Sequence, residues 1–339
     1  MKIIDAQNQK QWDDFITSHD EANFLQAWAW GEFHLSRNKK IVRRIVLDDK
    51  NNPIAAYVGE IETAKRGTYM AIAGGPIMDW TNKKTVRAVF KDIKEQGVSN
   101  NCVFVRVRPQ LEASKKSEKL FNDLGLKPAP YYLSVELAGV LNLDKTEDEI
   151  KKDAATRIRR ALNKARKEGV TVETSTDPKD IKKFYKIQLE TATRHKFYAF
   201  SEDFLGKQFA AFTENNQAKL YIAKHNDEIL AENFMIFYGN EASYHYGVSS
   251  EAGTKISSAP LLHFTAMEDA RKQGIKRYNF WGITGIDETK HRFYGVSQFK
   301  RGFGVSELQY LHAHDMILKP FAYKINWLVE TLRSKLRHV

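Results

Sequence analysis

A cluster of aromatic and cationic side chains near the C-terminus has the composition of a site for an anion beside a flat group. Between Arg292 and Gly304 the sequence reads RFYGVSQFKRGFG, in which glycines separate the aromatic residues. The cations are Arg292, Lys300 and Arg301, and the aromatic residues are Phe293, Tyr294, Phe299 and Phe303. Such a segment is suited to holding a phosphate or an oxyanion next to a planar ligand. A buried aromatic turn whose cations extend to solvent would have the same composition.

A second cationic segment, Lys151 to Glu168, has the pattern of a helix in the middle of the chain. Its basic residues are Lys151, Lys152, Arg157, Arg159, Arg160, Lys164, Arg166 and Lys167. This density is suited to following the phosphates of a nucleic acid. Acidic residues precede the basic ones, however, and a solvated surface helix complements its own dipole in the same way. The sequence leaves both interpretations open.

Several motifs that would identify a reaction are absent from the sequence. It contains no GxxxxGK[ST], GxSxG, HExxH or CxxC pattern, and its single cysteine is Cys102. Phosphate-loop NTPases, serine hydrolases and zinc enzymes therefore lose their usual sequence support, and we expect no metal and no cofactor. Enzymes that use coenzyme A often have an [QR]xxGx[GA] loop at a helix start. The equivalent loop here, Ser250–Lys255, begins with serine and lacks the second glycine, which weakens that interpretation.

The composition predicts a globular protein with a polyanionic partner. The chain has 339 residues, a net charge of +11 and a pI near 9.4. This charge favours nucleic acid, a phosphorylated substrate or an anionic membrane as the partner. The first residues show no apolar signal region, and no stretch approaches the ~18 apolar residues that would span a bilayer. We therefore expect a cytoplasmic location.

The two halves of the chain repeat one order of elements. In the first half, strand patterns at 41–47, 54–62 and 68–76 precede a helix pattern opened by Gly75-Pro76 and a strand at 102–109. In the second half, strand patterns at 220–223, 229–239 and 241–249 precede a helix pattern opened by Ala259-Pro260 and a strand at 277–283. Antiparallel strands followed by a crossover helix and a further strand are the order of an N-acyltransferase (GNAT-type) domain. We expect an α+β fold of two tandem GNAT-like domains.

The boundary between the domains is expected where the sequence turns abruptly polar and helical, at Lys145. Domain 1 would then comprise residues 1–144 and domain 2 residues 145–339. The C-terminal segment 320–339 has the pattern of an amphipathic helix, which we assign to domain 2. Its apolar residues are Phe321, Ile325, Trp327, Leu328 and Leu332. Packing on the protein body and contact with a membrane surface are both consistent with this pattern.

Taken together, these segments resemble the FemABX aminoacyltransferases, which add amino acids from aminoacyl-tRNA to the stem peptide of peptidoglycan precursors. The resemblance rests on segments in family order over most of the chain. They are FLQAWAWGEF, AGGPIMD, TRIRRALNKARKEGV, TATRHKFYAFSEDF, SYHYGVSS, YNFWGI and FYGVSQFKRGFG. Known members have two GNAT-like domains, and some carry a long helical hairpin in the second. No hairpin pattern is present here, so the chain resembles the compact FemX-like form.

The resemblance implies aminolysis, in which a side-chain amine of the stem peptide attacks the ester that links an amino acid to tRNA. Because the ester is already activated, neither ATP nor a covalent enzyme intermediate is required. Phe299 and Lys300 match a Phe-Lys pair of the compact members, so Lys300 is expected to stabilise the tetrahedral oxyanion. Tyr246 matches a family tyrosine at the substrate. Arg108 replaces a family aspartate, and we therefore assign no general base.

The resemblance also implies binding roles for further residues. Substrate binding is expected of Tyr246, His34, Trp30, Arg108, Tyr294 and Arg301, and tRNA binding of Arg157, Arg159, Arg160 and Lys164. The family positions for a nucleotide diphosphate fall near Glu32 or His34 and near Phe200, none of them a strong cation. This favours a lipid-linked acceptor, lipid II, over UDP-MurNAc-pentapeptide. Most aromatic residues of Gln26–His34 are expected in the core.

The favoured hypothesis is an aminoacyl-tRNA-dependent peptidoglycan aminoacyltransferase, with the acceptor on domain 1 and aminoacyl-tRNA on domain 2. Peripheral contact with the inner face of the plasma membrane is a further expectation. An acyl-CoA-dependent N-acyltransferase of the same superfamily is the first alternative, and it would turn over acetyl-CoA without tRNA. A non-catalytic protein that binds tRNA or anionic lipid is the second, and its binding would survive Lys300→Ala.

Overall fold

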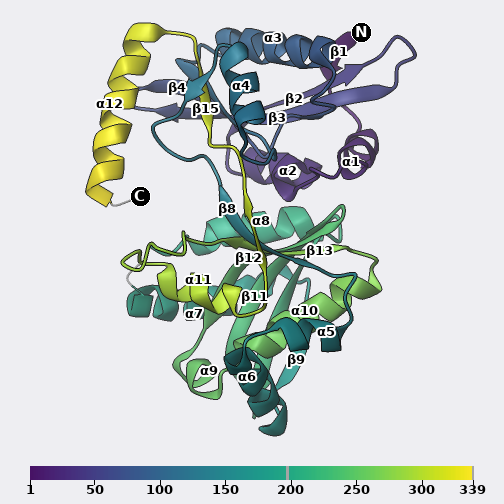
Figure 1. Cartoon of the computed structure of the whole chain (residues 1–339), viewed down its shortest axis with the longest axis vertical. Coiled ribbons are helices and arrows are strands. Elements are labelled where there is room, and N and C mark those ends of the chain that lie inside the picture. The colour runs from purple at the N-terminus through teal and green to yellow at the C-terminus, as the bar shows by residue number, and fades with distance from the viewer. Residues whose placement is uncertain (196–197, 338–339) are drawn as a thin grey trace. The chain divides into compact units, whose positions relative to one another are not determined.

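The computed structural model describes residues 1–195 and 198–337 and divides the chain into two compact units (Figure 1). Unit 1 contains Met1–Glu136 and the residues from Gln309 onward, and unit 2 contains Leu137–Leu308. Each unit has a sheet of antiparallel and parallel strands covered by helices. Lys196 and Phe197 of the segment TATRHKFYAFSEDF lie outside the described residues.

The sheet of unit 1 has the order β1-β2-β3-β4-β6-β15-β7, and the short strand β5 pairs with β3. Its strands are β1 (Lys2–Asp5), β2 (Lys40–Leu47), β3 (Pro53–Ala64), β4 (Gly67–Ala73), β5 (Ile77–Met78), β6 (Phe104–Arg108), β7 (Lys127–Pro128) and β15 (His314–Ile317). Strands β2, β3 and β4 form an antiparallel meander. Strand β6 joins β4 in parallel, and β15 joins β6 antiparallel.

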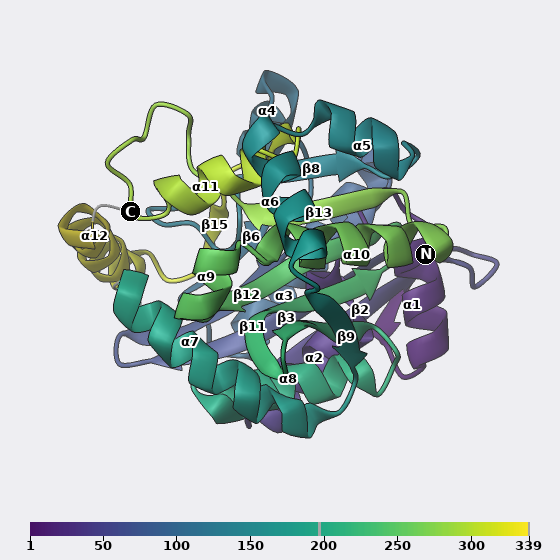
Figure 2. The same ribbon diagram turned by 90° about the horizontal axis from the view of Figure 1, so that it is seen from below.

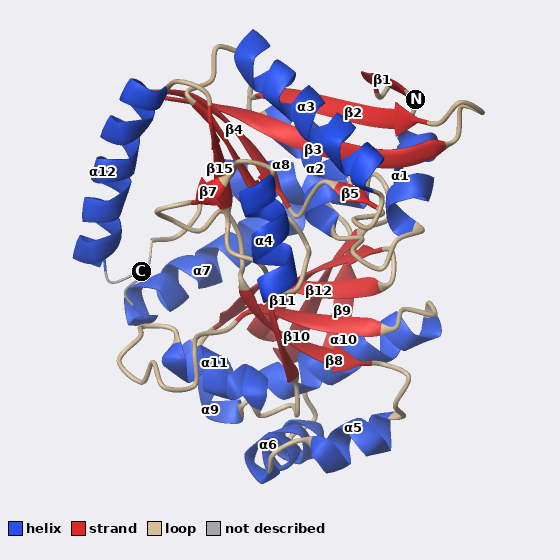
Figure 3. Cartoon of the chain, turned by 45° about the horizontal axis from the view of Figure 1, so that its top comes forward, coloured by secondary structure: helices blue, strands red, loops and turns tan. Residues whose placement is uncertain are grey.

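Helices cover both faces of this sheet (Figure 3). They are α1 (Gln9–Thr17), α2 (Trp28–Ser36), α3 (Lys83–Ser99), α4 (Lys115–Asp123) and α12 (Pro320–Arg337), with a 3₁₀ turn η1 (Phe24–Gln26) before α2. Helix α3 presents Val86, Val89, Phe90 and Ile93, spaced at helical intervals, to the core of unit 1. Helix α2 packs on β2 and β3 from the opposite face, where it covers the side chain of Glu60.

The sheet of unit 2 has the order β14-β8-β13-β12-β11-β10-β9. Its strands are β8 (Leu137–Asn142), β9 (Thr171–Ser175), β10 (Ala218–His225), β11 (Glu228–Tyr238), β12 (Glu241–Ser249), β13 (Arg277–Gly282) and β14 (Ser306–Gln309). Strands β10, β11 and β12 form an antiparallel meander, and β13 joins β12 in parallel. The meander and the parallel strand repeat the order found in unit 1.

The helices of unit 2 also lie on both faces of its sheet (Figure 2). They are α5 (Glu147–Asp153), α6 (Thr156–Lys167), α7 (Ile181–His195), α8 (Glu202–Thr213), α9 (Glu251–Ile256), α10 (Ala259–Lys272) and α11 (Tyr294–Arg301), with a 3₁₀ turn η2 (Pro178–Asp180) before α7. Helices α6 and α10 bury Leu162 and Leu262 in one cluster with Met235. On the opposite face, Phe209 of α8 packs edge-on against Phe234.

The duplication expected from the sequence is confirmed by these two sheets, and one helix start differs from the prediction. Helix α10 begins at Ala259, as predicted from Ala259-Pro260. Helix α3 begins only at Lys83, because strand β5 follows Gly75-Pro76 and Asn82 supplies the N-cap. The side chain of Asn82 accepts the backbone N–H of Thr85 at 3.2 Å, which satisfies one of the free donors of the first turn.

The division into units differs from the predicted boundary between residues 144 and 145. Strand β8 comes from the first half of the chain, yet it pairs antiparallel with β13 in the sheet of unit 2. Strand β15 comes from the end of the chain, yet it pairs with β6 in the sheet of unit 1. The assignment of the C-terminal helix to domain 2 is therefore corrected, since α12 follows β15 into unit 1. Each half of the chain gives one strand to the other half's sheet.

Helix α12 is fixed to unit 1 through polar side chains on one of its faces. Tyr323 donates its hydroxyl proton to Asp315 Oδ2 at 2.9 Å, and Glu330 pairs with Arg106 at 2.8 Å. Asn326 donates to the carbonyl of Arg66 at 3.1 Å. Within residues 1–195 and 198–337, no helix combines the length and the apolar character required to cross a bilayer.

Candidate active site

The side chain of Lys300 is buried inside unit 2. It lies near the end of α11 and keeps only 7% of its surface exposed. Its ammonium donates to the carbonyl of Gly282 at 2.8 Å and lies 5.5 Å from the ring centre of Tyr244. No carboxylate of the described residues pairs with it. Burial of an uncompensated ammonium lowers the pKa of Lys300 to about 7, so both protonation states are populated near neutral pH.

Lys300 lies where β12 and β13 separate. The two strands pair in parallel only from Glu241 to Ser243 on β12, although β12 continues to Ser249. Strand β13 ends at Gly282, whose carbonyl faces Lys300. Strands that diverge leave backbone groups and side chains without partners from the neighbouring strand. Here the ammonium of Lys300 satisfies one of those carbonyls.

A network of polar side chains, with Glu241 and Asn279 buried and Arg277 partly exposed, fixes the point of separation. Asn279 Nδ2 donates to Glu241 Oε1 at 3.1 Å, and Arg277 pairs with the second oxygen of Glu241 at 2.7 Å. The side-chain oxygen of Asn279 also accepts the backbone N–H of Trp281 at 2.7 Å. Trp281 has a φ of +64°, a left-handed conformation that is uncommon for a bulky residue. The network therefore holds the strand end that presents Gly282 to Lys300.

A β-bulge in β12 determines which tyrosine lies beside Lys300. The pairing of β12 with β11 shifts between Phe234 and Met235, so that Phe234 faces Tyr246 and Met235 faces Tyr244. Residues two apart on a regular strand share a face, but the extra residue in a bulge places them on opposite faces. Tyr244 consequently packs on the side of Lys300.

Tyr246, the tyrosine expected at the substrate, packs on the other face of the sheet of unit 2. Its ring centre lies 5.2 Å from that of Phe200 and 5.8 Å from that of Phe234. Phe200 is itself exposed and stacks on Phe204 of α8. The structure thus brings Tyr246 together with the aromatic residues of Phe200–Phe204, and it brings Tyr244 together with Lys300.

Aromatic rings surround the buried lysine. Phe299, the other member of the expected pair, lies 5.6 Å from the ring of His263 and 5.2 Å from that of Phe303. His263 is completely buried, and its Nδ1 lies 2.8 Å from the hydroxyl of Tyr278. Burial, and secondarily the charge of Lys300, lowers the pKa of His263 to about 3, so that this imidazole is neutral. The surroundings of Lys300 are therefore apolar, which strengthens any electrostatic interaction made there.

Helix α11 is held in place by residues on either side of Lys300. Ser297 Oγ accepts the backbone N–H of Thr284 at 2.9 Å. Arg301 pairs with Glu307 at 2.6 Å and donates to the carbonyl of Thr284, so its guanidinium serves this local structure. Tyr294, at the start of the helix, is half-buried. Of the aromatic and cationic cluster seen in the sequence, Phe299 and Phe303 pack on the core around Lys300.

The four residues expected to bind tRNA lie on α6 and have different surroundings. Arg157 donates to the carbonyl of Gln298 in α11, which links α6 to the helix that carries Lys300. Arg159 donates to the carbonyl of Ala154 at 2.7 Å, and Lys164 to that of Lys255 at 2.9 Å. Arg160 is exposed and makes no hydrogen bond or ion pair with another described residue. Three of these cations therefore have structural contacts as well.

In unit 1, Trp30 and His34 line a cavity of about 90 Å³. They lie four residues apart on α2, so both project from one side of the helix toward the sheet. Across the cavity, Glu60 Oε2 lies 2.9 Å from Nδ1 of His34. The structure thus confirms neither binding role, but it brings these two expected site residues together with an acid that sequence analysis did not single out.

The first-half motif AGGP is explained by close packing of η1 on the end of β4. Asn23 Nδ2 donates to the carbonyl of Gly74 at 2.8 Å, and Gln26 Nε2 donates to that of Ala73 at 2.8 Å. A Cβ on Gly74, whose φ is +72°, would lie 2.1 Å from Asn23 Oδ1. A Cβ on Gly75 would lie 2.5 Å from the Gln26 side chain. This motif supports α2 and its two cavity residues.

Arg108 is completely buried at the end of β6. Its Nε donates to the hydroxyl of Ser134 at 2.6 Å, and its guanidinium lies 5.0 Å from the ring centre of Tyr310. Ser134 follows Leu133, which forms one wall of the cavity in unit 1. Arg108 therefore presents no surface to a ligand and instead positions the segment that bounds the cavity.

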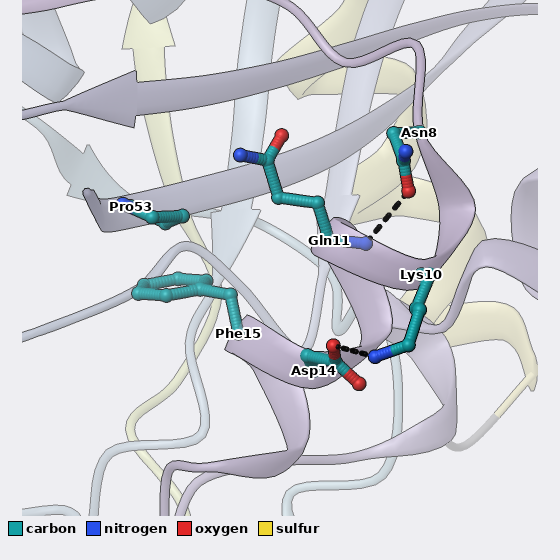
Figure 4. A pocket seen from close by; sticks show the side chains of 6 residues that line it. All are labelled: Asn8, Lys10, Gln11, Asp14, Phe15 and Pro53. Atoms are coloured by element: carbon teal, nitrogen blue, oxygen red, sulfur yellow. Dashed lines mark hydrogen bonds and ion pairs between the residues drawn. The ribbon is translucent and has the colours of Figure 1, made fainter. Parts of the chain in front are cut away.

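A shallow, open surface pocket of unit 1, about 470 Å³, lies at the start of α1 (Figure 4). Asn8 Oδ1 caps the helix by accepting the N–H of Gln11, and Lys10 pairs with Asp14 one turn later. Phe15 and Pro53 form its apolar wall. These groups satisfy one another, and no residue expected at a site from the sequence lines this pocket.

Tyr244, His263 and Glu60 were not predicted as site residues from the sequence. Tyr244 was visible in the segment SYHYG, but nothing in the alternation of that segment reveals the bulge. His263 lies in the apolar face of a helix, where a histidine is ordinarily a core residue. Glu60 stands in the pattern GEIE, which is indistinguishable from a strand that faces solvent on one side. Within the described residues, no group of three or more His, Cys, Asp or Glu side chains forms a site for a metal.

Two sequence families match different parts of the chain. Residues 8–123 match the FemAB family, and residues 152–301 match the acetyltransferase (GNAT) domain. Together with the two mixed sheets, these matches define a transferase built from tandem GNAT-like domains, so the expected fold and enzyme class are confirmed. The resemblance of the chain to the FemABX family is confirmed as well.

Individual relatives cover nearly the whole chain. A lipid II:glycine glycyltransferase of Staphylococcus aureus is 22% identical over 99% of this chain and 97% of its own length. The crystal structure of FemX superposes with a TM-score of 0.88 at 19% identity, covering 96% of this chain and 99% of FemX. The structure of L-PGS from Bacillus licheniformis has a TM-score of 0.59 at 14% identity, covering 96% of each chain. These structural similarities establish the fold.

Proposed function

We propose that this protein transfers an amino acid from aminoacyl-tRNA to a side-chain amine of a peptidoglycan-precursor stem peptide. The observation that carries the proposal is Lys300, a buried ammonium whose only hydrogen bond within the described chain goes to a carbonyl. When the acceptor amine attacks the ester, the carbonyl oxygen becomes negative, and a cation in an apolar environment stabilises that oxygen strongly. The C–N bond then forms as the C–O bond to the terminal ribose breaks, and the ribose hydroxyl takes a proton.

Lipid II is the acceptor that we propose, with binding on unit 1 and the aminoacyl-tRNA on unit 2. The glycyltransferase relative is named for lipid II. The cavity beneath α2, which contains the expected site residues Trp30 and His34, is lined by no Lys or Arg that would neutralise a diphosphate. On unit 2, exposed Arg160 and the neighbouring cations of α6 supply positive charge for the tRNA backbone.

The start of α9 argues against coenzyme A as the donor. Ser250 Oγ already accepts the backbone N–H of Gly253 at 3.0 Å, so this donor is not available to a pyrophosphate. Glu251 occupies the first turn of the helix and pairs with Lys255 at 2.8 Å. A carboxylate at this position repels an anion that would otherwise bind the helix start.

The test supplies charged tRNAs together with lipid II or UDP-linked pentapeptide and measures the acceptor by mass spectrometry. The proposal predicts addition of one or more amino acids to lipid II, with loss of transfer in Lys300→Ala. Unmodified acceptors with every charged tRNA would refute it. Turnover of acetyl-CoA without tRNA would instead establish an acyl-CoA-dependent enzyme.

We further propose that α12 binds an anionic bilayer, the surface in which lipid II resides. Phe321, Ile325, Leu328 and Leu332 recur at helical spacing on the face opposite Tyr323, and each is more than half exposed. The helix also carries four cations, Lys324, Arg333, Lys335 and Arg337, against a single acid that is paired with Arg106. An apolar stripe with basic residues is the pattern of a helix that lies in a membrane surface.

Co-sedimentation with vesicles tests this part of the proposal. The protein should sediment with vesicles that contain phosphatidylglycerol and remain in the supernatant with pure phosphatidylcholine. The double variant Ile325→Asp, Leu328→Asp should lose binding, whereas Ile286→Asp, which changes an exposed apolar residue of unit 2, should retain it. Equal binding by both variants would contradict a role for α12.

A further inference from the structure

The loop before helix α11 carries an aromatic and cationic pair that the transfer step at Lys300 does not use. Residues 283–293 connect β13 to α11, and the loop extends away from the sheet of unit 2 (Figure 2). Arg292 and Phe293 end this loop and open the aromatic and cationic cluster that the sequence contains. Both lie outside the core cluster to which Phe299 and Phe303 contribute.

Phe293 presents its ring to solvent among planar polar groups. The residue is 38% exposed, and the guanidinium of Arg292 lies 4.6 Å from its ring centre. The imidazole ring of His291 lies 5.6 Å from the same centre. A Cβ on Gly295, in the first turn of α11, would have no neighbouring atom within 4 Å, so open space adjoins the ring. Exposed aromatic rings and guanidinium planes are the surfaces on which unpaired nucleobases stack.

The cations of this loop are available to a polyanion. Lys290 and Arg292 are exposed, and neither pairs with a carboxylate of the described residues. The loop also contains two acids, Asp287 and Glu288, and the second of these accepts the backbone N–H of Gly285 at 2.8 Å. The basic side chains therefore remain free to neutralise phosphates of a ligand.

The cationic helix α6 adjoins the same helix. Arg157 of α6 donates to the carbonyl of Gln298 in α11, so the basic residues of α6 continue from this contact. Arg160, one turn further along, is exposed. The positive charge assigned to the tRNA backbone and the exposed ring thus border on one helix.

Helix geometry relates the exposed ring to the buried lysine. Phe293 is the N-cap of α11, and Lys300 follows seven residues later. Seven residues are almost two turns, so the two side chains leave the same side of the helix, about 10 Å apart along its axis. In an aminoacyl-tRNA, the terminal base is attached to the ribose that carries the amino acid. A base on Phe293 is therefore compatible with an ester at Lys300.

We propose that Arg292 and Phe293 bind the unpaired 3′ end of tRNA, with the terminal base stacked on the Phe293 ring and its phosphates beside Lys290 and Arg292. The inference rests on the proposed function and gives these residues a role in positioning the donor. Stacking is tolerant of sequence because every base has a planar face. The pair therefore recognises the single-stranded end common to all tRNAs.

The loop fits a nucleic acid better than a bilayer. The apolar residues exposed in and next to it are Ile286, Phe293 and Val296. They alternate with charged and small polar residues and form no continuous helical stripe, whereas a membrane-surface helix requires one. The contact of Phe293 with Arg292 also favours a planar ligand over acyl chains.

The experiment titrates the whole protein with uncharged RNA of sequence ACCA, in which 2-aminopurine replaces the terminal adenine. Stacking quenches the fluorescence of this base, so the wild type should quench it on binding. Phe293→Leu retains an apolar side chain without a ring, and it should abolish the quenching and weaken binding at least ~5-fold. Phe293→Tyr should restore both. Ile286→Ala removes exposed apolar surface from the same loop and should behave as the wild type.

Salt dependence tests the cations separately. The double variant Lys290→Gln, Arg292→Gln should reduce the slope of log K against log salt concentration by about 1.4, the value for two phosphate contacts of a single strand. Quenching that is unchanged in Phe293→Leu, or an unchanged slope in the double variant, would overturn the inference. So would loss of phosphatidylglycerol-vesicle binding in Phe293→Leu with no effect on the RNA probe.

The two proposals fail differently. Quenching that depends on Phe293, without transfer from any aminoacyl-tRNA, would refute the proposed function alone. Transfer by Phe293→Leu with the wild-type KM for aminoacyl-tRNA, together with unaltered quenching, would refute the role of the loop alone. Because Phe293 lies at the surface, its replacement by leucine should leave the thermal unfolding midpoint unchanged.

Discussion

Lys300 combines burial with the absence of a partner carboxylate in the described chain. Both features raise the free energy of the charged form of Lys300 relative to its neutral form, and this difference lowers its pKa to about 7. The contact with Gly282 offsets only part of it, because a single carbonyl replaces several water molecules. A buried charge that destabilises the fold is a candidate for function, because a methionine of similar length would pack at this position without the cost of desolvating a charge.

Replacement of Lys300 by methionine should stabilise the protein and abolish transfer. Lys300→Met removes the buried charge and keeps most of the hydrocarbon stem, so the free energy of unfolding at pH 6 should rise by about 1–3 kcal/mol. Urea denaturation measures the change. Because the native state releases its proton near pH 7 and the unfolded state near the ordinary lysine value, wild-type stability should increase above pH 7 and the gain from the substitution should shrink. A less stable variant at pH 6 would contradict this account.

The pH dependence of kcat should report the same group. If the ammonium stabilises the oxyanion, kcat falls as the pH rises through about 7, because Lys300 then loses its proton. Lys300→Arg retains a charge at every pH in the range and should lack this decline, whatever its absolute rate. Single-turnover rates over about pH 6 to 9 provide the measurement. A wild-type kcat that is level across this range would exclude the role.

At the scale of elements, the bulge in β12 is the feature that places Tyr244, and not Tyr246, beside Lys300. Gly247 follows these residues, and a Cβ there would lie only 1.7 Å from the hydroxyl of Tyr244. The bulge and the glycine together let the ring of Tyr244 lie against the strand, beneath Lys300. A side chain at position 247 would therefore displace Tyr244, and the displaced ring would change the surroundings of Lys300.

Gly247→Ala should displace Tyr244 and lower kcat by roughly 10- to 100-fold, because small displacements at a reacting centre have large effects on rate. The variant should also lose about 1–3 kcal/mol of stability from overpacking. Gly206→Ala is the matched control. That glycine lies within α8 with no atom within 4 Å of its added Cβ, so stability should rise by about 0.5–1 kcal/mol and kcat should not change. Equal kcat values for the two variants would show that the position of Tyr244 does not affect catalysis.

The elements were largely predictable, whereas their local irregularities were not. Alternating and helical periodicities identified both meanders and both crossover helices, because these patterns reflect which face of each element is buried. The bulge at Tyr244 leaves the alternation of polar and apolar residues unchanged, so no sequence signal reveals it. The cavity beside Glu60 forms because Ala71 and Ala73 of β4 lie opposite α2, and these two elements are distant in sequence. Lys300 was found through the family resemblance, and its burial was not foreseen.

At the scale of the whole molecule, the sequence alone does not predict that β8 and β15 are exchanged between the sheets of the two halves. The period-two pattern identifies a strand but contains no information about its partner. The prediction therefore placed the boundary at the next change in composition, residue 145, and left each half with its own strands. In the structure, β13 of unit 2 depends on β8, and β6 of unit 1 depends on β15.

Cutting the chain at the predicted boundary should yield a first fragment that does not fold cooperatively. Residues 1–144 lack β15, so β6 would expose an unpaired edge beside a buried meander, and they lack α12. Fragments 1–144 and 145–339, expressed separately, should show broad urea transitions by circular dichroism. Co-expression should restore one sharp transition, because the missing strand is then present. A sharp transition in 1–144 alone would show that the exchanged strand is dispensable.

The position of β15 near the end of the chain also sets an order of events on the ribosome. All strands of unit 2 have been synthesised once Gln309 is made, whereas the sheet of unit 1 remains incomplete until residues His314–Ile317 emerge. The unit that is translated first is therefore finished last. Throughout that interval β6 of the nascent chain has an unpaired edge, which leaves it open to pairing with other strands until β15 arrives.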